Sequence, residues 1–236
     1  MSPLFYIVEK AYAEGYEKMS YQIAIDGPAG AGKSTIARKV AKEKGFIYVD
    51  TGAMYRAMAY FLLTRKVNPK DAKAIEQNCQ AADITICYEN GEQVVLLNGE
   101  NVNGVIRSEE VGNMASASSS NPKVRERLTL LQKELARTND VVMDGRDIGS
   151  CVLPGADVKI YLTASARVRA KRRFDELNAR GVTCDMEQIE ADIIKRDQMD
   201  MTREIAPLKQ AEDAVLIDSS NMTVDEVVMA VLELCR

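Results

Sequence analysis

A glycine-rich segment with lysine and serine at its end is the most constraining feature of the sequence. Residues 27–34 read Gly-Pro-Ala-Gly-Ala-Gly-Lys-Ser and match the pattern GxxxxGK[ST] in full. An apolar run precedes the segment, and good helix formers follow it from residue 34 to 44. Strand, glycine-rich loop and helix in this order form a phosphate-binding loop (P-loop), because backbone N–H groups and the positive helix end face phosphate oxygens. The alternative, a turn that only caps a helix, is disfavoured by both flanks.

The polar residues of this loop have expected roles in nucleotide binding. Lys33 is predicted to bridge the β- and γ-phosphates of ATP, and the Ser34 hydroxyl to ligate Mg²⁺. The residues predicted to bind ATP here are Gly27, Pro28, Ala29, Gly30, Ala31, Gly32, Lys33, Ser34 and Thr35.

Short apolar runs alternate with helical patterns along the chain. The runs cover residues 22–25, 46–49, 141–143, 158–162 and 214–217, and helical patterns cover residues 34–44, 54–65 and 122–137. This alternation predicts an α/β fold with a doubly wound, five-stranded parallel sheet. Four of the runs end on aspartate (Asp26, Asp50, Asp144 and Asp218), at the edge where open α/β sheets bind ligands.

Two regions interrupt this rhythm. Between about residues 66 and 107, apolar runs surround Asn90-Gly91 and Asn98-Gly99, which predicts a small antiparallel insert. From about residue 163 to 206 the pattern is helical and dense in charge. Such a segment is either a solvated helical face or a mobile lid.

Two further motifs follow predicted strands. In Val141-Val-Met-Asp-Gly-Arg-Asp147, Asp144 is predicted to hold the water shell of Mg²⁺ and Arg146 to meet a substrate phosphate; simple helix caps are the alternative. Asp50-Thr-Gly-Ala-Met-Tyr-Arg56 opens a helix and predicts a second phosphate site at Thr51 and Arg56, unless Arg56 is only solvated. A guanine-reading Asn-Lys-x-Asp motif is absent from the sequence.

Composition excludes several classes of chemistry. The 236 residues include no histidine, which excludes a histidine base and a histidine-bound metal. The net charge of −4 gives no general attraction to nucleic acid or membranes, and charges interrupt every apolar run before it reaches the length of a membrane span. The five cysteines form no CxxC pair and are read as free thiols. We therefore expect a cytoplasmic, soluble protein with no nucleic-acid or membrane partner.

These motifs, together with Arg196-Asp-x-x-Asp200-x-x-Arg203 and Ala206-Pro-Leu208, resemble bacterial cytidylate kinase from about residue 21 to the C-terminus. The resemblance implies a P-loop kinase core (21–65, 108–162 and 207–236), an inserted monophosphate-binding lobe (66–107) and a helical lid (163–206). Residues 1–20 have no counterpart and are expected to form an N-terminal extension. The implied reaction is phosphorylation of CMP and dCMP by ATP with Mg²⁺, carried out by a monomer.

The family motifs also carry expected roles onto individual residues. The implied catalytic residues are Lys33, Asp144, Arg146, Arg196 and Arg203. The implied CMP-binding residues are Thr51, Arg56, Ser116, Arg125, Arg146, Asp147, Arg196, Asp200 and Arg203, with Asp147 and Arg125 reading the base and Asp200 the ribose. Arg172 is implied over ATP. Met199 and Met201 occupy lid positions where relatives often carry arginine.

Two alternatives stay open at this point. The chain could be a small-molecule P-loop kinase for another monophosphate, although the expected base pocket and the long insert argue against this. It could instead be an ATP-dependent switch protein, although the second phosphate site argues for an acceptor.

Overall fold

The computed structural model describes residues 20–235, so the expected extension lies outside the described residues except for Ser20. Two compact units divide this part of the chain. The core unit comprises residues 22–51 and 142–235, and the insert unit comprises residues 20–21 and 52–141. Within residues 20–235, no helix combines the length and apolar character needed to cross a bilayer.

A five-stranded parallel sheet organises the core unit, as the alternating apolar runs predicted. Its order is β2-β6-β1-β7-β8, and β1 and β7 pair in parallel with Ile23 beside Val158. The central strands β1 and β6 are almost wholly buried, which explains why their sequences are continuously apolar up to the terminal acid. The strands are β1 (Gln22–Asp26), β2 (Ile47–Asp50), β6 (Val141–Gly145), β7 (Val158–Thr163) and β8 (Val215–Asp218).

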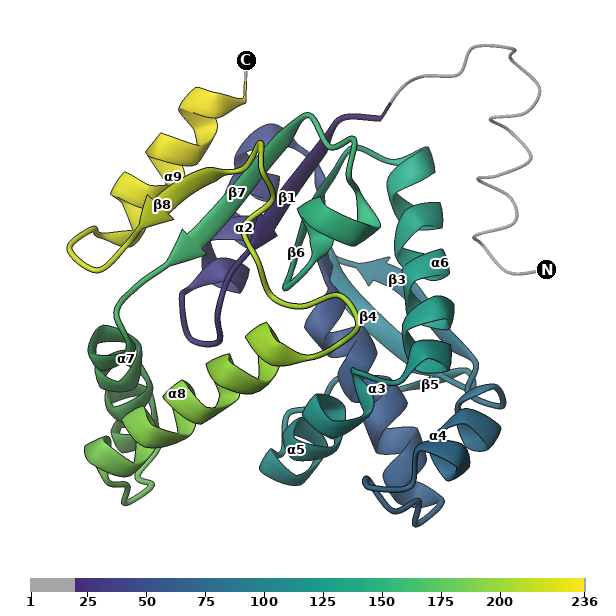
Figure 1. Cartoon of the computed structure of the whole chain (residues 1–236). Coiled ribbons are helices and arrows are strands. Elements are labelled where there is room, and N and C mark those ends of the chain that lie inside the picture. The colour runs from purple at the N-terminus through teal and green to yellow at the C-terminus, as the bar shows by residue number, and fades with distance from the viewer. Residues whose placement is uncertain (1–19, 236) are drawn as a thin grey trace, which may run out of the picture. The chain divides into compact units, whose positions relative to one another are not determined.

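Helices follow the strands of the core unit (Figure 1). They are α2 (Lys33–Lys44), the π-helix η1 (Ile148–Val152), α7 (Ala166–Ala179), α8 (Met186–Thr202) and α9 (Val224–Leu234). The apolar side of α2, with Ile36 and Val40, is buried, and α2 contacts β1, β2 and α9. Helices α7 and α8 pack side by side, and β7 leads into α7 (Figure 1). The charged region predicted as helical is therefore helical.

The connection from β1 into the P-loop requires glycine at its first position. Gly27 has φ of 148°, and a Cβ built there would lie 1.9 Å from the carbonyl oxygen of Leu162 on β7. Any side chain would therefore collide with the backbone of the neighbouring strand. This close approach fixes the loop tightly to the carboxyl end of the sheet.

The insert unit contains the predicted small antiparallel sheet, in the order β3-β4-β5. Asn90 and Gly91, and likewise Asn98 and Gly99, have φ between 51° and 85°, as two-residue hairpin turns require. The register follows, with Glu89 opposite Glu92. The elements are α3 (Thr51–Thr64), α4 (Ala72–Cys79), β3 (Ile84–Glu89), β4 (Glu92–Leu97), β5 (Glu100–Asn101), α5 (Glu109–Ser118) and α6 (Pro122–Thr138).

Candidate active site

The P-loop joins β1 to the first turn of α2. Lys33 is the first residue of the helix, and its Nζ donates a hydrogen bond to the carbonyl oxygen of Pro28 at 2.7 Å. The side chain is only 6% exposed. Burial, and after it the charge of Arg146, lowers the pKa of Lys33 to about 7. The lysine is thus held over the loop in surroundings where an added negative charge would favour its protonated form.

Asp144, at the end of β6, lies against the start of α2. Its Oδ2 accepts a hydrogen bond from the Ser34 hydroxyl at 2.9 Å, and its Oδ1 accepts one from the Tyr48 hydroxyl at 2.9 Å. Burial, followed by the charge of Asp50, raises the pKa of Asp144 to about 6. The Thr51 hydroxyl donates to the Asp144 carbonyl oxygen at 2.7 Å. A hydroxyl and a carboxylate therefore stand side by side, as a Mg²⁺ site beside phosphates needs.

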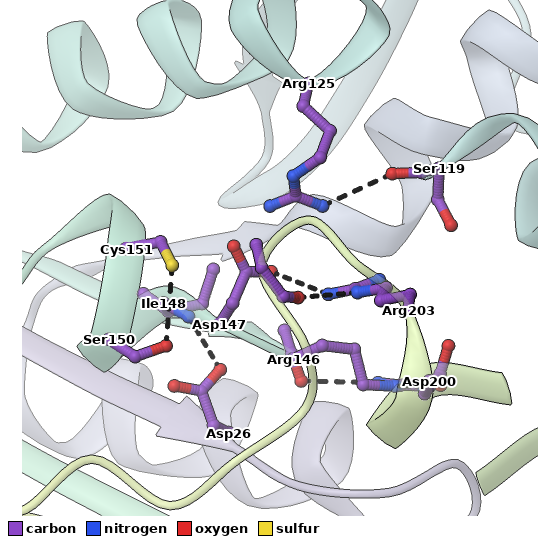
Figure 2. A network of polar contacts seen from close by, with 12 residues as sticks. Asp26, Ser119, Arg125, Arg146, Asp147, Ile148, Ser150, Cys151, Asp200 and Arg203 are labelled. Carbon is purple, nitrogen blue, oxygen red and sulfur yellow. Dashed lines mark hydrogen bonds and ion pairs between the residues drawn. The ribbon is translucent and has the colours of Figure 1, made fainter. Parts of the chain in front are cut away.

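Two ion pairs connect the segment after β6 to the end of α8, as Figure 2 shows. Arg146 Nε lies 3.0 Å from Asp200 Oδ2, and Arg203 Nη2 lies 3.3 Å from Asp147 Oδ1. Both members of the second pair have side chains less than a tenth exposed. Pairing satisfies these charges while keeping both guanidinium groups in fixed positions.

Asp26 holds the same segment from below, through backbone amides (Figure 2). Its two carboxylate oxygens accept hydrogen bonds from Ile148 N at 2.8 Å and Gly149 N at 2.7 Å. Burial raises the pKa of Asp26 to about 6, although the two amide bonds act to lower it. The residue that immediately precedes the P-loop thus also anchors the turn that carries Arg146 and Asp147.

The insert unit holds three of the predicted site residues. Arg56 Nη1 donates to the carbonyl oxygens of Ile106 at 3.2 Å and Ser108 at 3.4 Å. Arg125 is buried, and its Nη1 donates to the Ser119 carbonyl oxygen at 3.4 Å. Ser116 lies half-buried on α5. Within this unit, backbone carbonyls hold both guanidinium groups.

Comparison with known proteins decides the family. The model of the family described as cytidylate kinase matches residues 23–236. The chain belongs to the cytidylate kinase family. Curated relatives named cytidylate kinase come from Caldicellulosiruptor bescii, 52% identical over 90% of this chain and 94% of the relative, and Shouchella clausii, 46% identical over 92% and 96%. The chain is accordingly a nucleoside monophosphate kinase.

Further site residues that the family resemblance implied lie on or near α7 and α8. Arg172 bonds to Ser219, with its Nη2 2.8 Å from the carbonyl oxygen, and its Nη1 lies 4.0 Å from the position of a Cβ built on Gly32. Arg196 is half-buried on α8, one turn before Asp200. Met199 and Met201, near the end of α8, are about half exposed.

Three residues of this region were not assigned a role from the sequence. In the sequence, Asp26 is one of several acids at the ends of predicted strands, and no pattern around Tyr48 indicates a role. Arg169 was one arginine in a charged run, yet it is 5% exposed and bonds to the P-loop. The strand-end position of Asp26 was the one available clue.

Proposed function

We propose that this protein transfers the γ-phosphoryl group of ATP to CMP and dCMP, giving CDP and dCDP, with Mg²⁺ as cofactor. The observation that carries the proposal is the segment from Asp144 to Asp147. At one end it meets the P-loop through Ser34, and at its other end it carries Arg146 and Asp147, which pair with residues at the end of α8. In this proposal, the end of β6 therefore connects the site for the phosphoryl donor to the site for the phosphoryl acceptor.

The donor side fits the triphosphate of ATP. Backbone amides at the start of α2, together with Lys33, offer positive charge to the phosphates. Ser34 and Asp144 offer oxygen atoms of the kind that Mg²⁺ prefers, with Asp144 acting through a water molecule. Bound there, Mg²⁺ would offset charge on the phosphates during transfer.

The acceptor side fits a phosphate monoester. Arg146 and Arg203 are held in place by carboxylates, and Arg196 on α8 would add to the binding of the acceptor phosphate. An oxygen of that phosphate attacks the γ-phosphorus while the bond to the β–γ bridging oxygen breaks, which leaves ADP. The attacking oxygen is already anionic, so no dedicated base is needed. This suits a chain without histidine.

A coupled assay of ADP formation with each nucleoside monophosphate tests the proposal. We expect turnover with CMP and dCMP, and much slower turnover with UMP, AMP and GMP. Faster turnover with another monophosphate would make the chain a kinase for that substrate. Equal ADP formation with and without any acceptor would favour the alternative of an ATP-dependent switch.

The region 163–206 is proposed to act as a lid over the phosphates. Its two helices bury only one apolar side chain, Ala170; the others that they bury are Arg169, Asp197 and Asp200. Little hydrophobic area therefore stabilises them, and local opening should cost little free energy. Bound phosphates would add charge-assisted hydrogen bonds that order the region.

We expect hydrogen exchange in α7 and α8 to slow by roughly tenfold or more when a bisubstrate analogue joining ATP and CMP is bound. Exchange can be followed by mass spectrometry with and without the analogue. Helix α9, which packs on α2 through buried Val227, Val228 and Val231, is the internal control and should change little. Equal protection of α7 and α8 in both states would contradict a lid.

A further inference from the structure

Arg169 makes three hydrogen bonds that join separate parts of the core unit. Its Nε donates to the Ala164 carbonyl oxygen just after β7, and its Nη1 donates to the Ala29 carbonyl oxygen in the P-loop, both at 2.9 Å. Its Nη2 lies 2.6 Å from Asp197 Oδ2 on α8. A planar guanidinium can hold three acceptors in one rigid arrangement, which a lysine ammonium on a flexible stem cannot reproduce.

The contact with the P-loop is close as well as polar. A Cβ built on Gly30 would lie 3.4 Å from Arg169 Cβ. Helix α7 therefore packs directly on the loop backbone at Gly30, where there is no side chain whose movement could relieve the contact. A shift of the loop on binding phosphate would have to move the Arg169 guanidinium, or break its bond to Ala29.

Asp197 lies between Arg169 and the residues proposed to bind the acceptor, so a movement of Arg169 would reach them through Asp197. It follows Arg196 directly and lies one turn before Asp200, which pairs with Arg146. Its Oδ2 accepts the hydrogen bond from Arg169. Its Oδ1 is buried and has no hydrogen-bond partner among residues 20–235. A buried carboxylate oxygen without a donor raises the free energy of this arrangement, which favours a role other than stability alone.

We infer that Arg169 and Asp197 are positioning residues that couple occupancy of the P-loop to affinity at the acceptor-phosphate arginines. The inference rests on the proposed function, since it requires the two sites to hold ATP and CMP. The path runs from Ala29 through the guanidinium of Arg169 to Asp197, and along the last turn of α8 to Asp200. Because coupling between two binding sites is reciprocal, CMP should raise the affinity for ATP by the same factor.

A second ion pair between the same helices supplies the matched control. Arg167 Nη1 lies 2.7 Å from Glu190 Oε2, again joining α7 to α8. Arg167 is more than half exposed, and it donates a hydrogen bond to Glu190 rather than to the P-loop. If Arg169 served only to hold α7 against α8, loss of either pair would have the same kind of effect.

The test is calorimetric titration of CMP into the full chain, with and without saturating Mg²⁺ and a non-hydrolysable ATP analogue. In the unchanged protein we expect the analogue to tighten CMP binding by about fivefold or more, within the usual range of coupling. Arg169→Lys and Asp197→Asn should reduce this factor to less than about twofold, and Arg167→Lys should keep it. Thermal unfolding of each variant checks that it folds, and Asp197→Asn preserves side-chain shape in case Arg169→Lys does not fold.

Other outcomes would contradict either the coupling through Arg169 and Asp197 or the proposed function itself. Coupling that persists in both folded variants, or that falls equally in Arg167→Lys, overturns the inference. Binding of both ligands to the unchanged protein without any coupling overturns it as well, and leaves the proposed function standing. Failure of the unchanged protein to bind or phosphorylate CMP would overturn the proposed function, and the inference with it.

Discussion

Replacing Lys33 with alanine should lower kcat by about 100-fold to 1000-fold, which corresponds to roughly 3 kcal/mol of lost transition-state stabilisation. Its ammonium lies within reach of the P-loop carbonyl of Pro28. In the proposed reaction it offsets charge that develops on the transferred phosphoryl group. Lys33 is the only lysine among residues 27–34, so no other residue of the loop sequence can supply this charge.

Folding should survive this change. Lys33 is a buried amine whose pKa is lowered to about 7, chiefly by burial, so its charged form is disfavoured in the folded chain and its removal should cost little stability. The measurement is steady-state kcat together with the unfolding temperature. Lys39→Ala is the control on the same helix, because Lys39 is half exposed and pairs with Asp225. Near-normal turnover of Lys33→Ala would remove the P-loop lysine from the mechanism.

The sheet was predictable because each of its strands is an apolar run bounded by turn or cap residues. Local chemistry determined the insert in the same way, since Asn90-Gly91 and Asn98-Gly99 adopt the left-handed backbone that their residue types favour. These features depend on neighbours in sequence. Periodicity and turn preferences were therefore sufficient to predict them.

Contacts between distant residues were not predictable from such patterns. Asp26 anchors amides more than a hundred residues away at Ile148 and Gly149, and nothing near Asp26 in sequence indicates them. Arg167 and Arg169 are both arginines in one charged run, yet one is largely exposed and the other buried against the P-loop. Which arginine faces inward depends on how α7 packs on α8 and the loop, and that packing is a property of the tertiary structure.

The second large effect concerns the choice of base. Changing Asp147 to alanine should lower the ratio of kcat/KM for CMP over UMP by roughly tenfold to a hundredfold. Cytosine presents an amino donor where uracil presents a carbonyl oxygen, so a carboxylate accepts a hydrogen bond from cytosine and meets an acceptor in uracil. In the proposed site, a buried carboxylate that faces the uracil oxygen would have no hydrogen-bond donor, which adds to the preference for CMP over UMP.

The ion pairs of Asp147 and Asp200 suggest an alternative role for Asp147 and a variant that tests it. Asp147 Oδ1 lies 3.3 Å from Arg203 Nη2, so its role could be limited to holding that arginine for the acceptor phosphate. In that case Asp147→Ala would lower activity with CMP and UMP alike. Asp200→Asn is the matched comparison, because Asp200 holds Arg146 through a similar ion pair at 3.0 Å and is expected on the ribose, which both substrates share. A ratio that falls in Asp147→Ala but not in Asp200→Asn would assign base reading to Asp147. A ratio unchanged in both, with ATP affinity intact, would leave Asp147 as a support for Arg203.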